Sequence, residues 1–292
     1  MKYEMTSMKV NQVRELVELP NGFTLIQCKW VCKTKRNSKG NINQYKTRFV
    51  AKRFTLREDI DYNETLFPVL KKDSFRIFLA LIVHYDLELY QMDVKTTFLN
   101  GNLDENIYMR QPKGFEETGK EHLVCKLWKS IYGLKQASRQ WYIKFHNTIT
   151  TFGFQENKFD ECVYLKVRGS KFILLMLYVD DILLATNNLA LLHETKSFLS
   201  KNFEMKDMGN ASFVLGIEIY QYRCQCLIGL SQMAYINKVL ERFQIQKRSP
   251  ILAPIVKGNK FTTAKNKNDA IFLGALGKTS LFSFLWINVG AC

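Results

Sequence analysis

Two adjacent aspartates interrupt one of the most apolar stretches of this sequence. Phe172 to Thr186 consists of two apolar, strand-like runs on either side of Tyr178-Val179-Asp180-Asp181. Two like charges in apolar surroundings are costly unless something positive neutralises them, and a divalent cation is the natural partner. The stretch therefore predicts a hairpin with an acidic, metal-binding tip, and a plain polar turn is the alternative.

A third carboxylate is expected beside this pair. Because side chains alternate along a strand, Asp180 and Asp181 cannot both point at one spot, so a neighbouring strand must complete an oxygen-rich site. Asp93 is the candidate, since it lies in a strand-like run from Leu87 to Val94. The alternative for Asp93 is a cap for the segment that follows.

The positive charge of the chain is concentrated in one segment. The sequence has 42 Lys and Arg against 27 Asp and Glu, a net charge of +15. Lys29 to Arg57 contains ten basic and no acidic residues. Alternating segments on either side of a turn at 38–41 predict a β-hairpin. Its period of two places five cations on one face: Lys29, Lys33, Lys35, Lys46 and Arg48.

A surface of this kind indicates a polyanionic partner, nucleic acid before an anionic membrane. The alternative is a merely solvated face, although such a face normally mixes charges of both signs. The longest apolar stretch, Phe172 to Val179, is too short to span a bilayer, and the N-terminus has no apolar signal region, so we expect no membrane partner. Seven scattered cysteines indicate thiols without disulfide partners and an intracellular location, cytoplasmic or nuclear. The sequence does not specify an oligomeric state.

The remaining pattern predicts an α+β fold. The apolar stripe of Phe75, Phe78, Leu79, Ile82 and Val83 indicates a helix over 71–87. We expect three further helices and a strand: the second half of 128–152, with Gly133 near its start, then 189–203 and 232–243, and a strand over 213–222 with Gly216 inside it.

Five blocks of sequence, in order, carry a resemblance to a known family. They are CKWVCKTKR (28–36), QMDVKTTFLNG (91–101), IYGLKQASRQWY (131–142), the YxDD-like Tyr178–Asp181 and VLGIEI (214–219). Together they resemble the reverse transcriptase, the RNA-dependent DNA polymerase domain of the Pol polyprotein, of copia-type retrotransposons. The resemblance implies a right-hand polymerase fold with fingers, palm and an incomplete thumb, and RNA-directed DNA synthesis as the reaction.

The resemblance runs from Glu4 to Asp269. It implies fingers over about 20–88 and 100–135, a palm over about 89–99 and 136–222, and a partial thumb or connection over about 230–269. The tail, 270–292, departs from the family as an out-of-frame segment would. The integrase and RNase H regions of such polyproteins are not expected in this chain.

The resemblance also assigns roles at the reaction centre. Asp93, Asp180 and the Val94 carbonyl would hold two Mg²⁺ ions, with Mn²⁺ as the alternative metal, and Asp181 would complete the acidic cluster. Thr97, within the same block, stands where the family usually has alanine.

Other residues would bind the substrates, which are dNTPs and an RNA or DNA template with its primer. The nucleotide-binding candidates are Lys33, Lys35, Lys46, Arg48, Gln136 and Phe98, whose ring would lie under the sugar. Leu215, Gly216 and Ile217 would grip the primer, and Lys206 is the candidate general acid for pyrophosphate. The alternative function is a catalytically inactive retroelement remnant that only binds nucleic acid.

Overall fold

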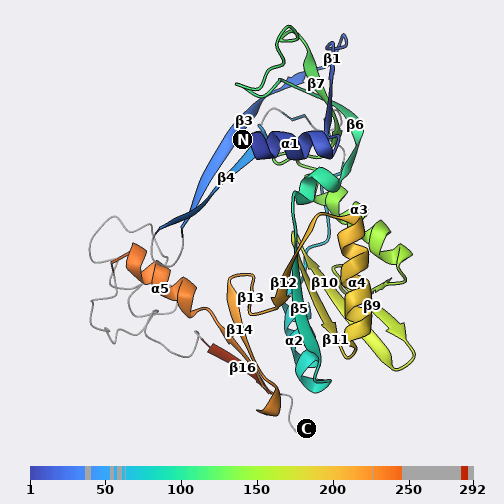
Figure 1. Cartoon of the computed structure of the whole chain (residues 1–292), viewed down its shortest axis with the longest axis vertical. Coiled ribbons are helices and arrows are strands. Elements are labelled where there is room, and N and C mark those ends of the chain that lie inside the picture. The colour runs from blue at the N-terminus through green and yellow to red at the C-terminus, as the bar shows by residue number, and fades with distance from the viewer. Residues whose placement is uncertain are drawn as a thin grey trace, which may run out of the picture. The chain divides into compact units, whose positions relative to one another are not determined.

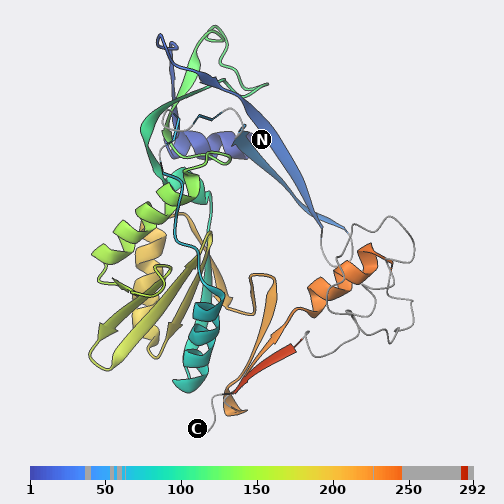
Figure 2. The same cartoon turned by 180° about the vertical axis from the view of Figure 1, so that it is seen from behind.

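The structure is a computed structural model that describes residues 1–36, 41–52, 56–57, 61–62, 64–225, 227–244 and 284–288 (Figures 1 and 2). The chain forms two compact units. The first contains Met1–Lys71 and Gln91–Asp207, and the second contains Lys72–Tyr90 and Met208–Cys292. Helices and strands are mixed throughout, which confirms the α+β class. The fingers, palm and thumb boundaries remain a prediction.

A six-stranded sheet is the framework of the first unit. Its order is β12-β5-β11-β10-β9-β8. The bounds are β5 Glu88–Val94, β8 Gln155–Glu156, β9 Val163–Arg168, β10 Lys171–Tyr178, β11 Asp181–Thr186 and β12 Met205–Asn210. Strand β10 pairs antiparallel with both β9 and β11. The two apolar runs around the acidic pair are therefore adjacent strands, as predicted.

Helices α3 (Ala137–Thr151) and α4 (Leu189–Asn202) belong to the same unit. The Asn188 side chain caps α4 by accepting a hydrogen bond from the Leu191 N–H. The rings of Phe152 and Phe198 stack 4.1 Å apart. The helix predicted for the second half of 128–152 is confirmed as α3, and the start of that range belongs to strand β7 (Val124–Lys129).

Gly133 lies near the start of α3, as predicted, in a tight turn that precedes the helix. It has a φ of 95°, and a Cβ there would clash with the Ala51 carbonyl oxygen. The Ala51 N–H donates to the Tyr132 carbonyl at 2.8 Å. Glycine is therefore needed for the close approach of two backbones, not for helix capping.

A second sheet in this unit has the order β1-β7-β6-β2, with β1 Arg14–Val17, β2 Leu25–Ile26 and β6 Asn102–Met109. Helix α1 (Lys2–Val10) was not predicted from the sequence. The core here is a cluster of buried side chains that includes Met8, Val13, Phe49, Leu99 and Leu127.

The basic segment forms the predicted hairpin, β3 (Cys28–Arg36) with β4 (Ile42–Ala51), drawn as a long ribbon in Figure 1. Trp30 pairs with Phe49, Val31 with Arg48 and Lys33 with Lys46. The register therefore keeps the five cations on one face. Residues 38–40 of the predicted turn lie outside the described residues.

The second unit contains α2 (Lys72–His84), α5 (Met233–Arg242) and a sheet of order β13-β14-β15-β16. The bounds are β13 Phe213–Val214, β14 Ile217–Tyr222, β15 Leu227–Ser231 and β16 Phe284–Asn288. The apolar stripe predicted for α2 is the set of residues that this helix buries. Arg223 pairs with Asp86 and Glu88, which ties the end of α2 to the sheet.

The single strand predicted over 213–222 was wrong. Leu215 and Gly216 both have positive φ, 57° and 79°, and form a turn between β13 and β14. The divergent tail supplies β16, which pairs with β15. Most of the predicted thumb, 245–269, lies outside the described residues. No helix among the described residues is long and apolar enough to cross a bilayer.

Candidate active site

The acidic hairpin is built by burying its two arms. In β10 and β11, Leu175, Leu177, Ile182 and Leu184 are at most 3% exposed. Tyr178 pairs with Asp181, so the turn contains only Val179 and Asp180. The Val94 N–H donates to the Asp180 carbonyl at 2.8 Å, which ties the turn to the end of β5. Asp93 and Asp180 therefore come from neighbouring strands, as the sequence predicted.

Asp93 and Asp180 line one cleft of about 520 Å³. Burial and the negative charge of Asp180 raise the pKa of Asp93, while Lys46, Lys206 and Lys35 oppose the shift. A carboxylate in this position gains from a nearby cation.

Asp181 makes a different contact. Its Oδ1 accepts a hydrogen bond from Gln91 Nε2 at 2.8 Å. Burial raises the pKa of Asp181, and this hydrogen bond lowers it. Among the described residues, no group of three or more Asp, Glu, His or Cys side chains is arranged to hold a metal ion. The structure therefore brings two of the three predicted aspartates together at the cleft and directs the third to Gln91.

Cations from two elements line the same cleft. Lys35, Lys46 and Arg48 come from the basic hairpin, and Lys206 comes from β12, the neighbour of β5 in the sheet. Burial lowers the pKa of Lys46, and the positive charges of Arg48 and Lys35 lower it further. Crowded cations of this kind favour an anionic ligand such as a polyphosphate. Lys33 lies opposite Lys46 in the register but does not line the cleft.

Two residues near these cations, Glu4 and Tyr132, were missed by sequence reasoning. Glu4 of α1 lines the cleft, and its pKa is raised by burial and lowered by a hydrogen bond to the Phe49 backbone and by Arg48. The Arg48 guanidinium lies over the Tyr132 ring, 4.7 Å from the centroid. Glu4 is therefore an acidic neighbour of the acid-free run at 29–57 that comes from outside the run. A lone Glu in a mixed-charge terminus gives no sequence signal for this placement.

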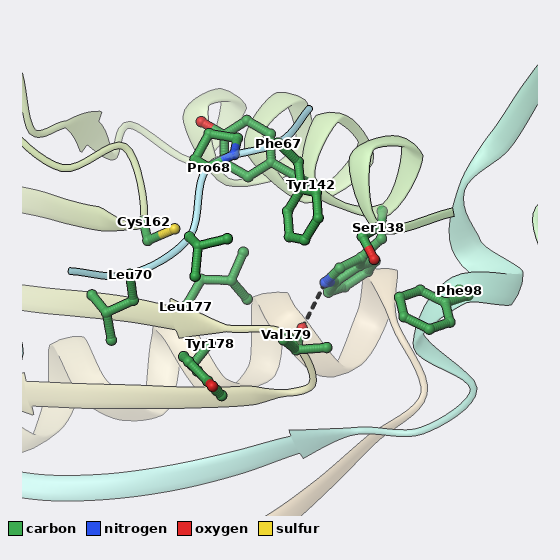
Figure 3. A pocket seen from close by; sticks show the side chains of 12 residues that line it. Phe67, Pro68, Leu70, Phe98, Ser138, Tyr142, Cys162, Leu177, Tyr178 and Val179 are labelled. Carbon is green, nitrogen blue, oxygen red and sulfur yellow. Dashed lines mark hydrogen bonds between the residues drawn. The ribbon is translucent and has the colours of Figure 1, made fainter. Parts of the chain in front are cut away.

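The Val94 carbonyl and Phe98 lie just beyond Asp93. The Thr97 hydroxyl donates to the Val94 carbonyl at 3.0 Å, which leaves that oxygen one further lone pair. Phe98 lies on the short helix η2 (Thr97–Asn100) and packs edge-on against Tyr132 at 5.1 Å. It is half-buried and lines a second, apolar cavity beside the acidic turn (Figure 3).

The other predicted site residues lie elsewhere. Gln136 is fully buried at the start of α3, and its Nε2 donates to the Asp61 carbonyl at 3.0 Å. Its Oε1 has no partner among the described residues. Leu215, Gly216 and Ile217 form the β13–β14 turn and the start of β14 in the second unit.

The donor set at the cleft suits a hard divalent cation. Mg²⁺ prefers carboxylate and carbonyl oxygens, and Asp93, Asp180 and Val94 provide them. Burial and the negative charge of Asp180 raise the pKa of Asp93, and a bound cation would oppose both effects. These residues fit Mg²⁺, and Asp181, whose Oδ1 accepts a hydrogen bond from Gln91, keeps its second carboxylate oxygen.

Comparison with known proteins places this chain in a family. Residues 11–257 match the family described as reverse transcriptase (RNA-dependent DNA polymerase). The chain is 45% identical over 256 residues to the retrovirus-related Pol polyprotein from transposon TNT 1-94 of Nicotiana tabacum, covering 87% of this chain and 19% of that protein. It is 36% identical over 268 residues to that from transposon RE1 of Arabidopsis thaliana, covering 91% of this chain and 18% of that protein.

The chain thus spans about a fifth of the length of these relatives. Among solved structures, a truncated apo telomerase from Candida tropicalis gives a TM-score of 0.39 at 10% identity, covering 76% of this chain and 58% of that chain. The transposon relatives confirm the resemblance to copia-type Pol polyproteins. With a family match over most of its length, this chain belongs to the reverse transcriptase (RNA-dependent DNA polymerase) family.

Proposed function

We propose that the cleft between the acidic and basic hairpins carries out RNA-directed DNA synthesis, adding deoxynucleotides to the 3′-hydroxyl of a primer. One observation supports this most strongly: Asp93 and Asp180 line the same cleft as Lys35, Lys46 and Arg48. Phosphoryl transfer needs both kinds of group, because charge on the phosphates must be neutralised while the reacting oxygens are held in line.

The residues divide the work by charge. Lys35, Lys46 and Arg48 would attract and orient the triphosphate of the incoming nucleotide. Asp93, Asp180 and the Val94 carbonyl would hold Mg²⁺, whose chemistry is to lower the pKa of the primer 3′-hydroxyl and to neutralise the leaving pyrophosphate. Lys206 lines the same cleft and would give a proton to pyrophosphate.

The other candidate residues would act on the substrates. Phe98 would exclude the 2′-hydroxyl of a ribonucleotide. Lys33 and Gln136 would contact the nucleotide, and the turn at 215–217 would contact the primer. The protein would act inside the cell, in the cytoplasm or nucleus.

A nucleic-acid-binding protein without polymerase activity is the second candidate. Two observations favour this candidate. Asp181 is hydrogen-bonded to Gln91, and the described residues contain no group of three or more side chains arranged to hold a metal ion. The basic hairpin alone would be enough for such binding.

Primer extension separates the two. The purified chain should extend oligo(dT) on poly(rA) with dTTP and Mg²⁺, and EDTA should stop the reaction. An Asp180→Asn variant purified in parallel serves as the control for contaminating polymerases. Retention of primer-template with no extension in Mg²⁺ or Mn²⁺ would favour the second candidate.

A further inference from the structure

The turn that carries Asp180 has a strained backbone. Val179 is the first of its two residues and has a φ of 54°, in the left-handed region that glycine favours. Among non-glycine residues, a β-branched one is least suited to this region. A positive φ at the first turn position alone is typical of a type II′ turn, where glycine is normally found. Something else must therefore hold Val179 in this conformation.

Packing does not hold it. The Val179 side chain is 39% exposed. Val179 also lines a cavity of about 90 Å³, together with Leu177 (Figure 3) and Trp141. Side chains beside such a gap lose van der Waals contacts on that side.

A hydrogen bond from Trp141 takes the place of packing. The Trp141 Nε1–H donates to the Val179 carbonyl at 2.7 Å, drawn as the dashed line in Figure 3. Trp141 lies on α3, is 2% exposed and contacts the rings of Phe145 and Phe203. Because its ring is fixed by the core, the donor has one direction only.

The turn is then fixed at two successive carbonyls. Val179 is held by Trp141 and Asp180 is held by the Val94 N–H. The second bond links Asp180 to the strand end that carries Asp93. The first sets the orientation of the peptide that leads into Asp180.

We propose that Trp141 is a positioning residue for the polymerase reaction. Its indole N–H holds Val179 in the left-handed conformation, and this places the Asp180 carboxylate opposite Asp93. This role rests on the proposed function of the cleft. Trp141 contacts neither substrate nor metal and acts only through the turn.

The test first removes the indole N–H with Trp141→Phe and then removes the backbone strain at position 179 with Val179→Gly. Trp141→Phe should lower the maximal single-turnover rate about tenfold, the equivalent of ~1.4 kcal/mol. Primer-template affinity should stay within about twofold, because the basic hairpin is untouched. Mn²⁺ affinity, measured by electron paramagnetic resonance without turnover, should fall by a similar factor to the rate.

Adding Val179→Gly should rescue the variant, because glycine adopts this φ without the penalty. The Trp141→Phe/Val179→Gly double variant should recover rate and Mn²⁺ affinity to within about threefold of Val179→Gly alone. The hydrogen bond from Trp141 is no longer needed once the residue at 179 adopts the left-handed conformation without strain. A purely structural role of Trp141 would give no such rescue.

Two controls separate the bond from the core. Trp128→Phe makes the same change at an exposed indole that bonds Glu15, and should leave rate and Mn²⁺ affinity as they are. Phe145→Leu disturbs the ring cluster without removing the hydrogen bond, so it should lower the melting temperature and leave Mn²⁺ affinity nearly unchanged. If Trp141→Phe is less stable than Phe145→Leu, a benzothiophene analogue of tryptophan at position 141 replaces only the N–H by sulfur.

Unchanged rate and Mn²⁺ affinity in Trp141→Phe, or no rescue by Val179→Gly, would overturn the proposal. Failure of the proposed polymerase function gives a different result from failure of the role proposed for Trp141. In that case the unmodified chain would not extend primers, while the Mn²⁺ comparison would still report on Trp141.

Discussion

The two hairpins that border the cleft are both pairs of antiparallel strands, but they differ in burial and in charge. The arms of β10–β11 are central strands of a six-stranded sheet; β11 is buried beyond its first residue, and β10 is exposed only at its two ends. Strands β3 and β4 form a sheet of their own, with β3 exposed along most of its length. One presents carboxylates at a fixed turn, and the other presents cations along a face.

This difference indicates two kinds of work. A turn anchored by a buried sheet can hold a carboxylate within the tight tolerance that chemistry requires. An exposed cationic face acts over a longer range and tolerates adjustment, as phosphate binding does. Changes at the acidic hairpin and β5 should therefore lower the rate, and changes at the basic hairpin should lower affinity.

The largest effect is expected for Asp93→Asn. Loss of one carboxylate ligand should lower the extension rate by about 10³-fold or more, because metal ions contribute several kcal/mol to such reactions. Primer-template affinity should be nearly unchanged. Single-turnover incorporation and equilibrium binding measure the two quantities.

The same variant should be more stable than the unmodified chain. Burial and Asp180 raise the pKa of Asp93, so ionised Asp93 costs stability in the folded state. This cost is fully present at neutral pH and disappears as the pH falls below the ordinary aspartate value of about 4. Asp93→Asn should therefore melt higher than the unmodified chain at pH 7 and not at pH 3. Full activity or a lower melting temperature would contradict the assignment.

The next largest effect is expected for the Lys35→Ala/Lys46→Ala/Arg48→Ala variant. The KM for dNTP should rise tenfold or more, since charge-assisted contacts are lost, while the maximal rate should change by less than about threefold. The slope of log affinity for primer-template against log salt should become shallower, because each phosphate contact contributes about −0.9. Lys29→Ala is the matched control, on the same face but outside the cleft. An unchanged slope and KM would make the hairpin a solvated surface only.

A smaller and more selective effect is expected for Phe98→Val. If Phe98 excludes the 2′-hydroxyl, the ratio of kcat/KM for dTTP to that for UTP should fall about tenfold, with modest loss for dTTP. Its contact with Tyr132 also gives it a packing role, so a stability loss of about 1–3 kcal/mol is expected as well. Leu99→Val, in the same short helix, should lose stability without changing the ratio. An unaltered ratio in folded Phe98→Val would leave packing as its only role.

The smallest effect is expected for Thr97→Ala, which removes the hydrogen bond to the Val94 carbonyl. The freed oxygen should bind Mg²⁺ better, so the Mg²⁺ concentration for half-maximal rate should fall about two- to fivefold, as one modest hydrogen bond allows. Thr97→Ser keeps the hydroxyl and should resemble the unmodified chain. A higher Mg²⁺ requirement in Thr97→Ala would mean that Thr97 supports the site.

The features that could be predicted from the sequence are those with a local pattern. The helix α2 stripe, the acidic turn between apolar strands and the face of the basic hairpin all follow from side-chain periodicity. Contacts between distant segments have no such pattern. Sequence reasoning therefore missed the bond of Asp181 to Gln91, the bond of Trp141 to Val179 and the approach of Glu4 to the basic hairpin.

Backbone reversals were also hard to predict. Gly216 was taken as a strand residue because the apolar alternation continues across it, whereas Leu215 and Gly216 together form a turn. Strand β7 was not predicted either, because its partner β1 is more than a hundred residues away in the sequence. Such pairings depend on the whole fold rather than on neighbouring residues.

One paired measurement tests most directly whether the two hairpins divide chemistry and binding. Single-turnover dTTP incorporation on poly(rA)/oligo(dT) is measured over a range of dTTP concentrations for Asp180→Asn and for the Lys35→Ala/Lys46→Ala/Arg48→Ala variant. We predict that Asp180→Asn loses the maximal rate and keeps primer-template affinity. The triple variant should approach the maximal rate of the unmodified chain at saturating dTTP, with weaker affinity. Loss of the same parameter in both variants would contradict this division.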